Sequence, residues 1–296
     1  MAKVVSVAGP IPRHRAEERR LWIMKQVRTN VVPRIILILM GALYLLPFYW
    51  MITLALKSNA ELTLTPPTLY PHHLEWVNFK NAVDAIPFGR FFKNTVIITI
   101  ASVLASIFSN TVIAYGFSRI QWPGRDKIFF VVVATIFMPF PVILVALFDI
   151  FAKLHWINTY LPLIIPLCFG SPILIFLMRQ FMMQLPQEVS DAAKIDGASE
   201  LRIFAQIVLP QALPAIGVVA ILSAIGAWND FLGPLVYLQD QAKYTLAIGL
   251  TYFQSTHDIR YNLLMAASVL VVLPVIVLFL FFQRAFVEGI SVGSIK

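Results

Sequence analysis

The residues of this chain that could act on another molecule are concentrated in one polar stretch, residues 186–210. Four carboxylates lie there among alanines: Glu188, Asp191, Asp196 and Glu200. Acids near a helix N-terminus interact favourably with the helix dipole. Gly197 is placed to end a first helix in the left-handed region, and Ser199 is placed to cap a second one. The pattern predicts two short helices that meet at a glycine bend.

Helices this short are marginal in isolation and need another surface to bury their apolar side. Val189, Ala192 and Ala193 are spaced to share one face of the first helix. Helices that lie on lipid headgroups favour bulky apolar residues opposite Lys and Arg, and an anionic leaflet repels acids. We therefore predict that residues 186–210 dock into a groove of a partner protein. The alternatives are an interfacial helix and a simple connecting loop.

The sequence contains none of the patterns that catalysis or metal binding would require. It has no Gly-x-x-x-x-Gly-Lys-Ser/Thr loop for nucleotide phosphates and no His-Glu-x-x-His pair for zinc. The five histidines are scattered, and the apolar segments hold no convincing pair of nucleophile and base. We expect no catalytic residue, no metal and no cofactor on this chain, so an enzyme is the poorer class.

Polar residues within or beside apolar segments form a second group of candidates, because such side chains face a bundle interior or a cavity. Asn110 is equally compatible with an interhelical hydrogen bond and with a transport pathway. For Trp228, Asn229 and Asp230 we favour a structural role, a loop cap at the interface with Trp228 as an aromatic anchor, over a gate or a binding-protein contact. Asp230 needs a partner, since a helix C-terminus disfavours negative charge. The pathway candidates are Asn110, Tyr115, Ser171, Trp228, Asn229 and Asn262.

The elements that must position these residues are membrane spans. Of the 296 residues, 59% are hydrophobic and 13% are charged, whereas soluble domains carry about 25% charged residues. A bilayer core roughly 30 Å thick is crossed by about 20 mostly apolar residues. Six stretches qualify: 35–56, 95–117, 128–150, 160–178, 209–229 and 262–283. Pro139 and Pro141 interrupt the third, which a span tolerates where neighbouring helices satisfy the freed carbonyls.

Lys and Arg are distributed unevenly around these spans. Sixteen of the 23 lie in the N-terminal tail, the 118–127 and 179–208 loops and the C-terminus, and the other seven lie on the opposite side. The positive-inside rule then makes both termini and residues 186–210 cytoplasmic. Because the basic residues flank spans and form no single patch, the net charge of +8 does not indicate nucleic acid binding.

Several motifs together point to a family. Asp191-Ala192-Ala193, then Asp196-Gly197-Ala198, then Ile207, Leu209 and Pro210 resemble the Glu-Ala-Ala loop of ABC importer permeases. Segments 114–127, 227–238, 244–250 and 283–296 resemble, in the same order, segments of the maltose-type carbohydrate branch. Within that branch the fit is to the smaller six-span permease. The resemblance covers roughly residues 30–296. The family usually has Glu where this chain has Asp191.

The resemblance implies roles for two sets of residues. In the family the loop is a coupling helix seated in a cleft of the ATPase, which implies coupling roles for Glu188, Asp191, Ala192, Ala193, Asp196, Gly197, Ala198, Ile207, Leu209 and Pro210. The family's C-terminal tail reaches the ATPase dimer and usually ends in a further Gly, which implies contacts by Gly289, Gly293 and Lys296.

These inferences give an all-α polytopic membrane protein with six transmembrane helices. Its parts are a basic cytoplasmic N-terminal tail (1–30), a six-helix importer domain (31–288) and a cytoplasmic C-terminal tail (289–296). A coupling helix lies between spans four and five, within the coupling loop 186–210. The expected location is the inner membrane of a bacterial cell.

The expected function is that of a permease subunit in a binding-protein-dependent, ATP-driven importer of a sugar or oligosaccharide. The resemblance implies five partners: a second, different permease, an ATPase dimer that binds ATP and Mg, an extracytoplasmic solute-binding protein, the sugar and the lipid bilayer. It also implies that the larger permease supplies most sugar contacts. Lys80, Arg90 and Lys93 are compatible with an acidic saccharide and equally with snorkelling or paired side chains. The alternative is an ion-coupled secondary transporter, but that class favours carboxylates buried inside spans.

Overall fold

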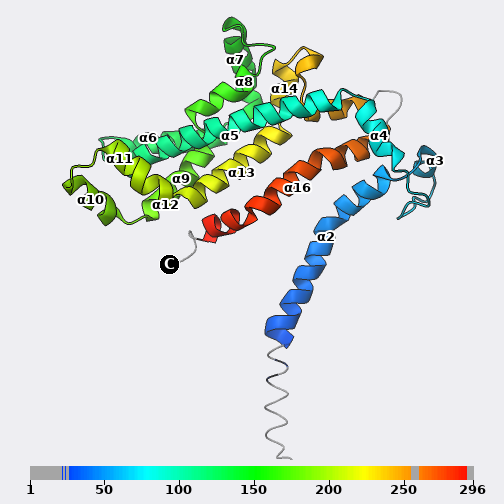
Figure 1. Ribbon diagram of the computed structural model, residues 1–296, viewed down its shortest axis with the longest axis horizontal. Helices are drawn as coiled ribbons and strands as arrows, with labels where there is room; N and C mark the ends of the chain where they lie inside the picture. Colours follow the sequence, from blue (N-terminus) through cyan, green and yellow to red (C-terminus); the bar gives the residue numbers. More distant parts are fainter. Residues whose placement is uncertain (1–21, 23, 25–26, 255–259, 292–296) are drawn as a thin grey trace, which may run out of the picture. The chain divides into compact units, whose positions relative to one another are not determined.

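The computed structural model describes residues 22, 24, 27–254 and 260–291, and of residues 27, 28 and 284–291 it describes the backbone alone. Most of the N-terminal tail, Gly293 and Lys296 therefore lie outside the described residues, and Gly289 is described by its backbone only. The chain divides into two units, Met1–Thr53 and Leu54–Lys296. The first contains most of helix α2, and the second contains all other labelled helices (Figure 1).

All regular elements among the described residues are helical, which confirms the predicted all-α class. In chain order the helices are α2 (Val32–Ala55), α3 (Asn59–Leu62), α4 (Val77–Asp84), α5 (Phe88–Ser118), α6 (Arg125–Ala134), α7 (Phe140–Lys153), α8 (Leu161–Ile164), α9 (Pro172–Gln184), α10 (Gln187–Ile195), α11 (Glu200–Ile203), α12 (Leu209–Gln211), α13 (Leu213–Asn229), α14 (Leu232–Tyr237), α15 (Leu246–Gly249) and α16 (Tyr261–Ser291). Short π-helical turns lie at Val27–Val31 and Phe204–Val208, and 3-10 turns lie at Thr135–Phe137, Ile165–Phe169, Gln241–Lys243 and Leu250–Phe253.

The number of helices that could cross a membrane depends on how bent pairs are counted. Four segments are long and apolar enough by themselves: Thr29–Ala55, Phe88–Ser118, Leu161–Gln184 and Tyr261–Gln283. Two further pairs of helices qualify only if each bent pair is one span, which raises the number in the described part of the chain to six. The six predicted spans correspond to this upper number.

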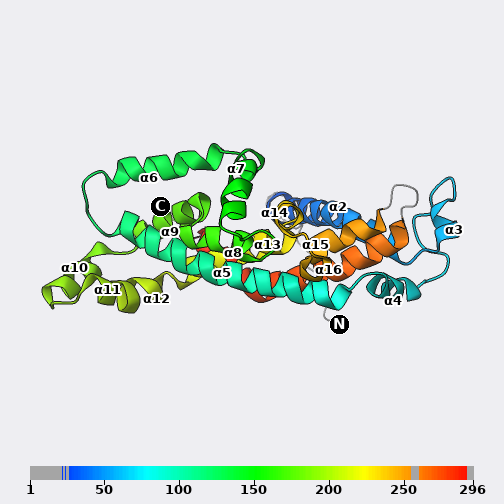
Figure 2. The same ribbon diagram turned by 90° about the horizontal axis from the view of Figure 1, so that it is seen from above.

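The second unit is built around three long helices. α13 packs against both α5 and α16, and α9 packs against α5 and also contacts α13 (Figure 1). Helices α10 to α12 lie at one end of α5, and α4 lies at the opposite end (Figure 2). Small residues such as Ala266 and Ala267 are fully buried in α16, which allows the close helix approach that membrane bundles use.

The third predicted span, 128–150, is interrupted at its prolines, as the sequence suggested. α6 and the turn that follows it end at Phe137, α7 begins at Phe140, and the two segments are bent by 102°. Proline removes a backbone donor and disfavours helical conformation in the residue before it. Met138 and Pro139 are extended, so Pro139 and Pro141 divide this segment into two short helices.

The fifth predicted span is also shorter than its apolar stretch. α12 and α13 meet at Ala212, and the segments Glu200–Gln211 and Leu213–Asn229 are bent by 77°. Pro214 stands in the first turn of α13, where its missing N–H costs nothing. Residues 209–211 therefore belong to the bend, and the long apolar helix is α13 alone.

The fourth predicted span is interrupted by the 3-10 turn Ile165–Phe169 and by Gly170. Two side chains of α5 bind the backbone at this break. Gly170 has φ of +87°, and an added Cβ there would lie 2.8 Å from Ile175 Cδ1, so no larger residue fits. Ser109 donates to Leu167 O at 2.7 Å, and Ser171 N–H donates to Asn110 Oδ1 at 2.8 Å. Asn110 and Ser109 thus satisfy backbone groups that the interruption would leave unpaired.

The N-terminal half of α5 holds the segment that follows α14. Asn94 donates to Ala242 O at 2.9 Å and to Tyr244 O at 3.0 Å, and Leu246 N–H donates to Thr95 Oγ1 at 2.9 Å. These residues lie about 150 positions apart in the chain, so no local pattern predicts the pairing. The loops 57–93 and 230–260 are partly ordered, as the sequence suggested.

Candidate functional site

Residues 186–210 fold as the two short helices that the sequence predicts. α10 ends at Ile195, Gly197 has φ of +79°, and α11 begins at Glu200. Gly197 N–H donates to Lys194 O and Ala198 N–H donates to Ala193 O, which together form a Schellman motif. Ser199 Oγ accepts from Arg202 N–H at 3.4 Å as the expected N-cap.

The bundle covers only part of the predicted face of this bend. Ser190 is buried and Ala193 and Ala198 pack against a core cluster with Ile203 and Val208, but Val189 and Ala192 are exposed. Val189 and Ala192 are thus left uncovered by this chain, as a face that docks into a partner protein requires, whereas Ala193 is partly buried by the bundle. A nine-residue helix has two usable sides, and spacing alone does not tell which side the bundle covers.

Arg119, which follows α5, binds the segment that leads from α9 into α10. Its Nη2 donates to Met182 O at 2.7 Å and to Leu185 O at 2.8 Å, and its Nη1 donates to Gln187 Oε1 at 2.6 Å. The guanidinium is buried, so these hydrogen bonds satisfy donors that would otherwise be costly. Sequence reasoning used Arg119 only as a sign of topology. Its proximity to residues 182–187 depends on the tertiary fold.

Tyr115 links α5 to α11. Its hydroxyl donates to Glu200 Oε2 at 2.7 Å, and Lys194 Nζ lies 2.8 Å from Glu200 Oε1. The pKa of Glu200 is lowered, first by the Lys194 ammonium and then by the Tyr115 hydroxyl. We refer to Tyr115, Glu200 and Lys194 as the 115–200–194 link. Tyr115 was predicted as a pathway candidate, and the structure places it in this link at the end of α5.

The outward side of the bend exposes apolar side chains that have no cover in the described chain. Val189 is 46% exposed, Ile195 is 87% exposed and Leu201 is 75% exposed. Glu188 and Asp191 are exposed on the same short helix. We refer to Val189, Ile195 and Leu201 as the apolar knob. Ile207, Leu209 and Pro210 instead continue into the bend before α13, where Ile207 is partly buried against the core.

A second arginine, Arg179 of α9, links α9 to the end of α5 and to α6. Arg179 Nε donates to Phe117 O at 3.1 Å, its Nη2 lies 2.7 Å from Asp126 Oδ1, and its guanidinium stands 4.0 Å from the Phe129 ring centroid. Such stacked and paired geometry suits the planar guanidinium and not a lysine ammonium. Arg119 and Arg179 thus each join separate segments of the bundle. The distribution of Lys and Arg among the loops did not indicate this role.

Three pathway candidates, Trp228, Asn262 and Asn110, are buried at packing contacts, and Asn229 is exposed. Trp228 is buried and its indole N–H donates to Val271 O at 3.1 Å, so it packs within the bundle and does not act as an interfacial anchor. Asn229 donates to Ile225 O of its own helix. Asn262 is buried and donates to Asn78 Oδ1 at 3.3 Å. Asn110 is fully buried and braces the break before α9.

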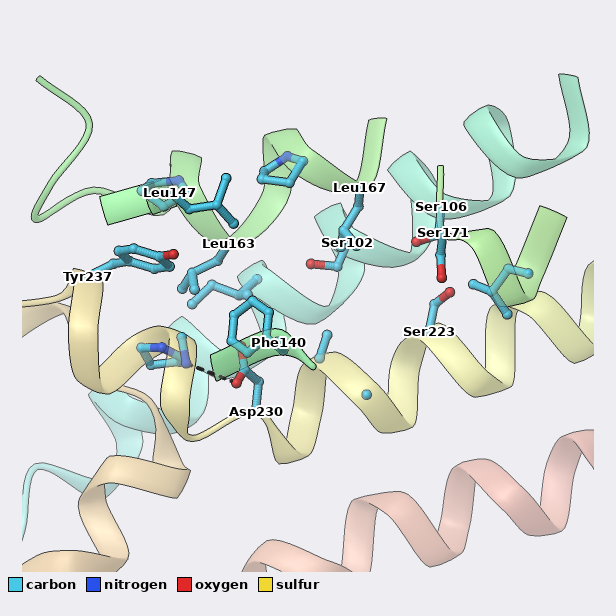
Figure 3. Close-up of a pocket in the computed structure, with 18 of the residues that line it drawn as sticks. Ser102, Ser106, Phe140, Leu147, Leu163, Leu167, Ser171, Ser223, Asp230 and Tyr237 are labelled. Atoms are coloured by element: carbon cyan, nitrogen blue, oxygen red, sulfur yellow. Dashed lines mark hydrogen bonds between the residues drawn. The ribbon is translucent and has the colours of Figure 1, made fainter. Parts of the chain in front are cut away.

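A cavity of about 560 Å³ lies beside the interrupted fourth span (Figure 3). Its walls come from α5, α7, α8, α9, α13 and α14, and Ser171 is the one predicted pathway candidate that lines it. Asp230 also lines it and accepts from Gly233 N–H at 3.1 Å, which supplies the partner that the sequence predicted for this carboxylate. Lys80, Arg90 and Lys93 are exposed and do not line this cavity.

Several polar groups in the cavity wall have no protein partner. Ser102 and Tyr237 are 1% and 2% exposed, and their hydroxyls make no hydrogen bond to protein. The buried Ser223 hydroxyl also makes no hydrogen bond to protein. Buried hydroxyls are normally satisfied, so groups of this kind mark a place for water or ligand. No group of three or more metal-ligating side chains occurs among the described residues.

A family profile described as the binding-protein-dependent transport system inner membrane component matches residues 111–292. The arabinooligosaccharides transport system permease protein AraQ of Halalkalibacterium halodurans is 34% identical, over 81% of this chain and 85% of that protein. The diacetylchitobiose uptake system permease protein NgcG of Streptomyces coelicolor is 32% identical, over 91% and 90%. The trehalose/maltose transport system permease protein MalG of Thermococcus litoralis is 32% identical, over 91% and 99%.

Solved structures share the fold. A chain of a bacterial ABC transporter involved in the import of the acidic polysaccharide alginate has a TM-score of 0.73 at 21% identity, with 88% of this chain and 97% of that chain covered. A chain of a bacterial alginate ABC transporter in complex with an alginate pentasaccharide-bound periplasmic protein has a TM-score of 0.60 at 16% identity, with 91% and 95% covered. At these identities the similarity is one of fold.

Proposed function

The chain belongs to the family of binding-protein-dependent transport system inner membrane components, and we propose that it is a permease subunit of an ATP-driven importer of a sugar or oligosaccharide. Relatives that transport arabino-oligosaccharides, diacetylchitobiose and trehalose or maltose support this substrate class. They do not favour the ion-coupled alternative.

The observation that carries the coupling part of the proposal is the apolar knob. A bend whose apolar residues Ile195 and Leu201 are 87% and 75% exposed needs a partner surface to cover them. Lipid is a poor cover, because Glu188 and Asp191 stand beside these residues and an anionic leaflet repels acids. A cleft of an ATPase subunit, which binds ATP and Mg itself, is the occupant that fits the family.

The contacts of Arg119 and of the 115–200–194 link suggest how motion reaches the spans. They attach both short helices to the end of α5 and to the end of α9. When the ATPase dimer closes on ATP, its clefts carry α10 and α11 with them. Because the short helices are attached through partly buried hydrogen bonds, α5 and α9 follow as a rigid body and shift the bundle between its two openings.

The remaining partners follow from this role. The chain forms half of a translocation pathway with a second, different permease in the bacterial inner membrane. Its termini and residues 186–210 face the cytoplasm, as the positive-inside rule requires. The loops 57–93 and 230–260 face a solute-binding protein on the other side. The ATPase dimer is also the proposed contact of the C-terminal residues Gly289, Gly293 and Lys296.

The test is a copurification of the ATPase with the assembled permease pair. In Ile195→Asp the charge faces outward at a position that is 87% exposed, so the chain itself should fold and insert normally. A buried charge in the cleft is strongly unfavourable, and we expect at least about a tenfold loss of bound ATPase and of sugar uptake.

The matched control is Leu69→Asp, which places the same charge at an apolar residue that is 68% exposed in the 57–93 loop. This variant should keep its ATPase. Normal ATPase binding by Ile195→Asp, at wild-type abundance in the membrane, would refute the docking role of the knob.

A further inference from the structure

We propose that the cavity beside the interrupted fourth span is a saccharide subsite for an uncharged sugar unit, in which the Asp230 carboxylate and the hydroxyls of Ser102, Ser223 and Tyr237 bind ring hydroxyls. The inference rests on the proposed function and names the substrate class that this subunit accepts. It also assigns sugar contacts to this chain, whereas the resemblance alone gave most of them to the larger permease.

The size and walls of the cavity fit a sugar unit. Its volume of about 560 Å³ lies within the roughly 300–1,000 Å³ of small-molecule sites. Phe140, Leu147 and Phe151 contribute apolar walls. Carbohydrate rings combine apolar C–H faces with hydroxyl edges, so a site with an apolar wall and a polar edge matches both. Figure 3 shows Phe140 and Leu147 around the same space as the polar residues.

The polar groups match hydroxyl ligands in particular. The hydroxyls of Ser102, Ser223 and Tyr237 have no protein partner, and each can both donate and accept. A ligand hydroxyl has the same double capacity. Ser102 and Tyr237 are at least 98% buried, so unpaired hydroxyls here favour a ligand that satisfies them. Without a sugar, the same groups would hold water.

The carboxylate of Asp230 is held in place on one side and remains available on the other. Oδ1 accepts from Gly233 N–H at 3.1 Å, and this bond is drawn in Figure 3. A Cβ on Gly233 would stand 2.5 Å from Asp230 Oδ2, so the glycine leaves room for the second oxygen. That oxygen makes no hydrogen bond within the described part of the protein and can accept from a sugar hydroxyl.

The charges select against acidic sugars. Asp230 is the one carboxylate among the lining residues, and these include no Lys, Arg or His. A uronate in the cavity would place a second negative charge near Asp230 with no cation among the lining residues to balance it, which is unfavourable. The cavity therefore accepts neutral units and rejects acidic ones. A metal ion is also a poor occupant, because one carboxylate and three hydroxyls are a weak ligand set.

The test uses the complete importer, with its second permease and ATPase, reconstituted in lipid vesicles. The probes are the neutral sugars maltose, raffinose, diacetylchitobiose and arabinotriose and the acidic trisaccharide of alginate. Uptake of the best neutral probe should show a KM at least about tenfold higher in Asp230→Asn and in the double variant S102A/S223A. The acidic trisaccharide should not be taken up by the wild type.

Conservative substitutions and a matched control variant keep the result interpretable. Asp230→Asn retains Oδ1 for the Gly233 N–H, and Tyr237→Phe retains the ring, so either change preserves the packing. Ser268→Ala is the matched control, because this hydroxyl donates to Leu264 O of its own helix and lies outside the cavity. Its KM should equal that of the wild type.

Two results would overturn the subsite. The first is a wild-type KM in Asp230→Asn, S102A/S223A and Tyr237→Phe with neutral sugar still imported, which leaves the proposed function intact. The second is preferential uptake of the acidic trisaccharide, which contradicts the charge argument and with it a subsite for an uncharged sugar unit. Absence of uptake of every saccharide by the wild type would instead remove the proposed function, and the subsite with it.

Discussion

Glu61 organises the loop between residues 58 and 75 although it is almost fully buried. Its Oε1 accepts from the Thr68 hydroxyl at 2.8 Å and from His72 N–H at 3.2 Å, and His72 Nδ1 lies 3.6 Å away. Burial raises the pKa of Glu61, but these hydrogen bonds and the nearby charges outweigh it, so the pKa lies below its ordinary value of 4.5. One carboxylate thus fixes three parts of a loop that has little helix.

The lowered pKa sets the pH dependence of Glu61→Gln. A carboxylate with a depressed pKa contributes stability that is present above its unfolded pKa and is lost as pH falls through the folded pKa. The melting temperature of the wild type should therefore exceed that of Glu61→Gln at pH 7. The difference should shrink as pH falls below about 4.5. Each kcal/mol lost corresponds to roughly 2–4 °C for a domain of this size.

Asp84→Asn is the matched control for this measurement, since Asp84 is exposed in α4. Its melting temperature should follow the wild type at each pH. A difference between wild type and Glu61→Gln that persists undiminished at pH 3.5 would contradict the role of the Glu61 charge.

At the scale of the element, the bend between α10 and α11 depends on one backbone conformation. Gly197 has φ of +79°, yet a Cβ there would meet no atom within 4 Å. Substitution is therefore limited by the left-handed backbone and not by space. For ordinary residues this conformation costs roughly 1–2 kcal/mol, and it is most unfavourable for β-branched ones.

Gly197→Val should reduce sugar uptake by up to about tenfold while the chain still inserts, because about 1.4 kcal/mol against the bend lowers the equilibrium constant for its formation by that factor. Gly197→Asn is the control, since Asn tolerates the left-handed region. Uptake and membrane abundance of both variants would be compared with the wild type. Equal uptake by the two variants would show that the left-handed backbone conformation at residue 197 is not required.

The break in the fourth span, unlike the bend at Gly197, depends on side chains of a neighbouring helix. Its break is supported from α5, where Ser109 and Asn110 bind the backbone at Leu167 and Ser171. A polar residue at mid-span suggested a packing role or a pathway role equally. The structure gives Asn110 the packing role, and that role places Ser171 beside the cavity.

At the scale of the whole molecule, the question is how residues 186–210 transmit force to the bundle. Partly buried hydrogen bonds from Arg119 and Tyr115 connect them to α5, and α5 packs in turn against α9 and α13. If this connection transmits motion, loosening it should separate ATP hydrolysis from transport without preventing assembly.

Tyr115→Phe tests this connection by removing the hydroxyl that donates to Glu200 at 2.7 Å. A hydrogen bond to a charged group that is partly exposed is worth about 1 kcal/mol. The ratio of sugar transported to ATP hydrolysed should fall by about fivefold. The double variant with Glu200→Gln should lower the ratio little further, because both changes break the same bond.

Tyr244→Phe is the control for this ratio. Its hydroxyl donates to Gln239 O at 3.4 Å at the opposite end of α5, away from the short helices. A ratio in Tyr115→Phe that equals the wild-type ratio would show that the 115–200–194 link does not carry the motion.

The sequence by itself determined the helical class, the apolar stretches, the glycine corner and the family motifs. Each of these depends on local properties: hydropathy over about 20 residues, the φ freedom of glycine, or short spacing along the chain. The Schellman bend at Gly197 and the cap at Ser199 were predictable for this reason.

Only the tertiary structure decided which faces are covered and which distant groups meet. Val189 and Ala192 lie outward because the bundle covers Ala193, and Trp228 is inside because α16 packs against α13. The meeting of Tyr115 with Glu200, 85 residues on, and of Ser102 with Asp230 around one cavity results from helix packing. Packing brings together residues whose separation in the chain carries no periodic signal, so no pattern in the sequence could predict these contacts.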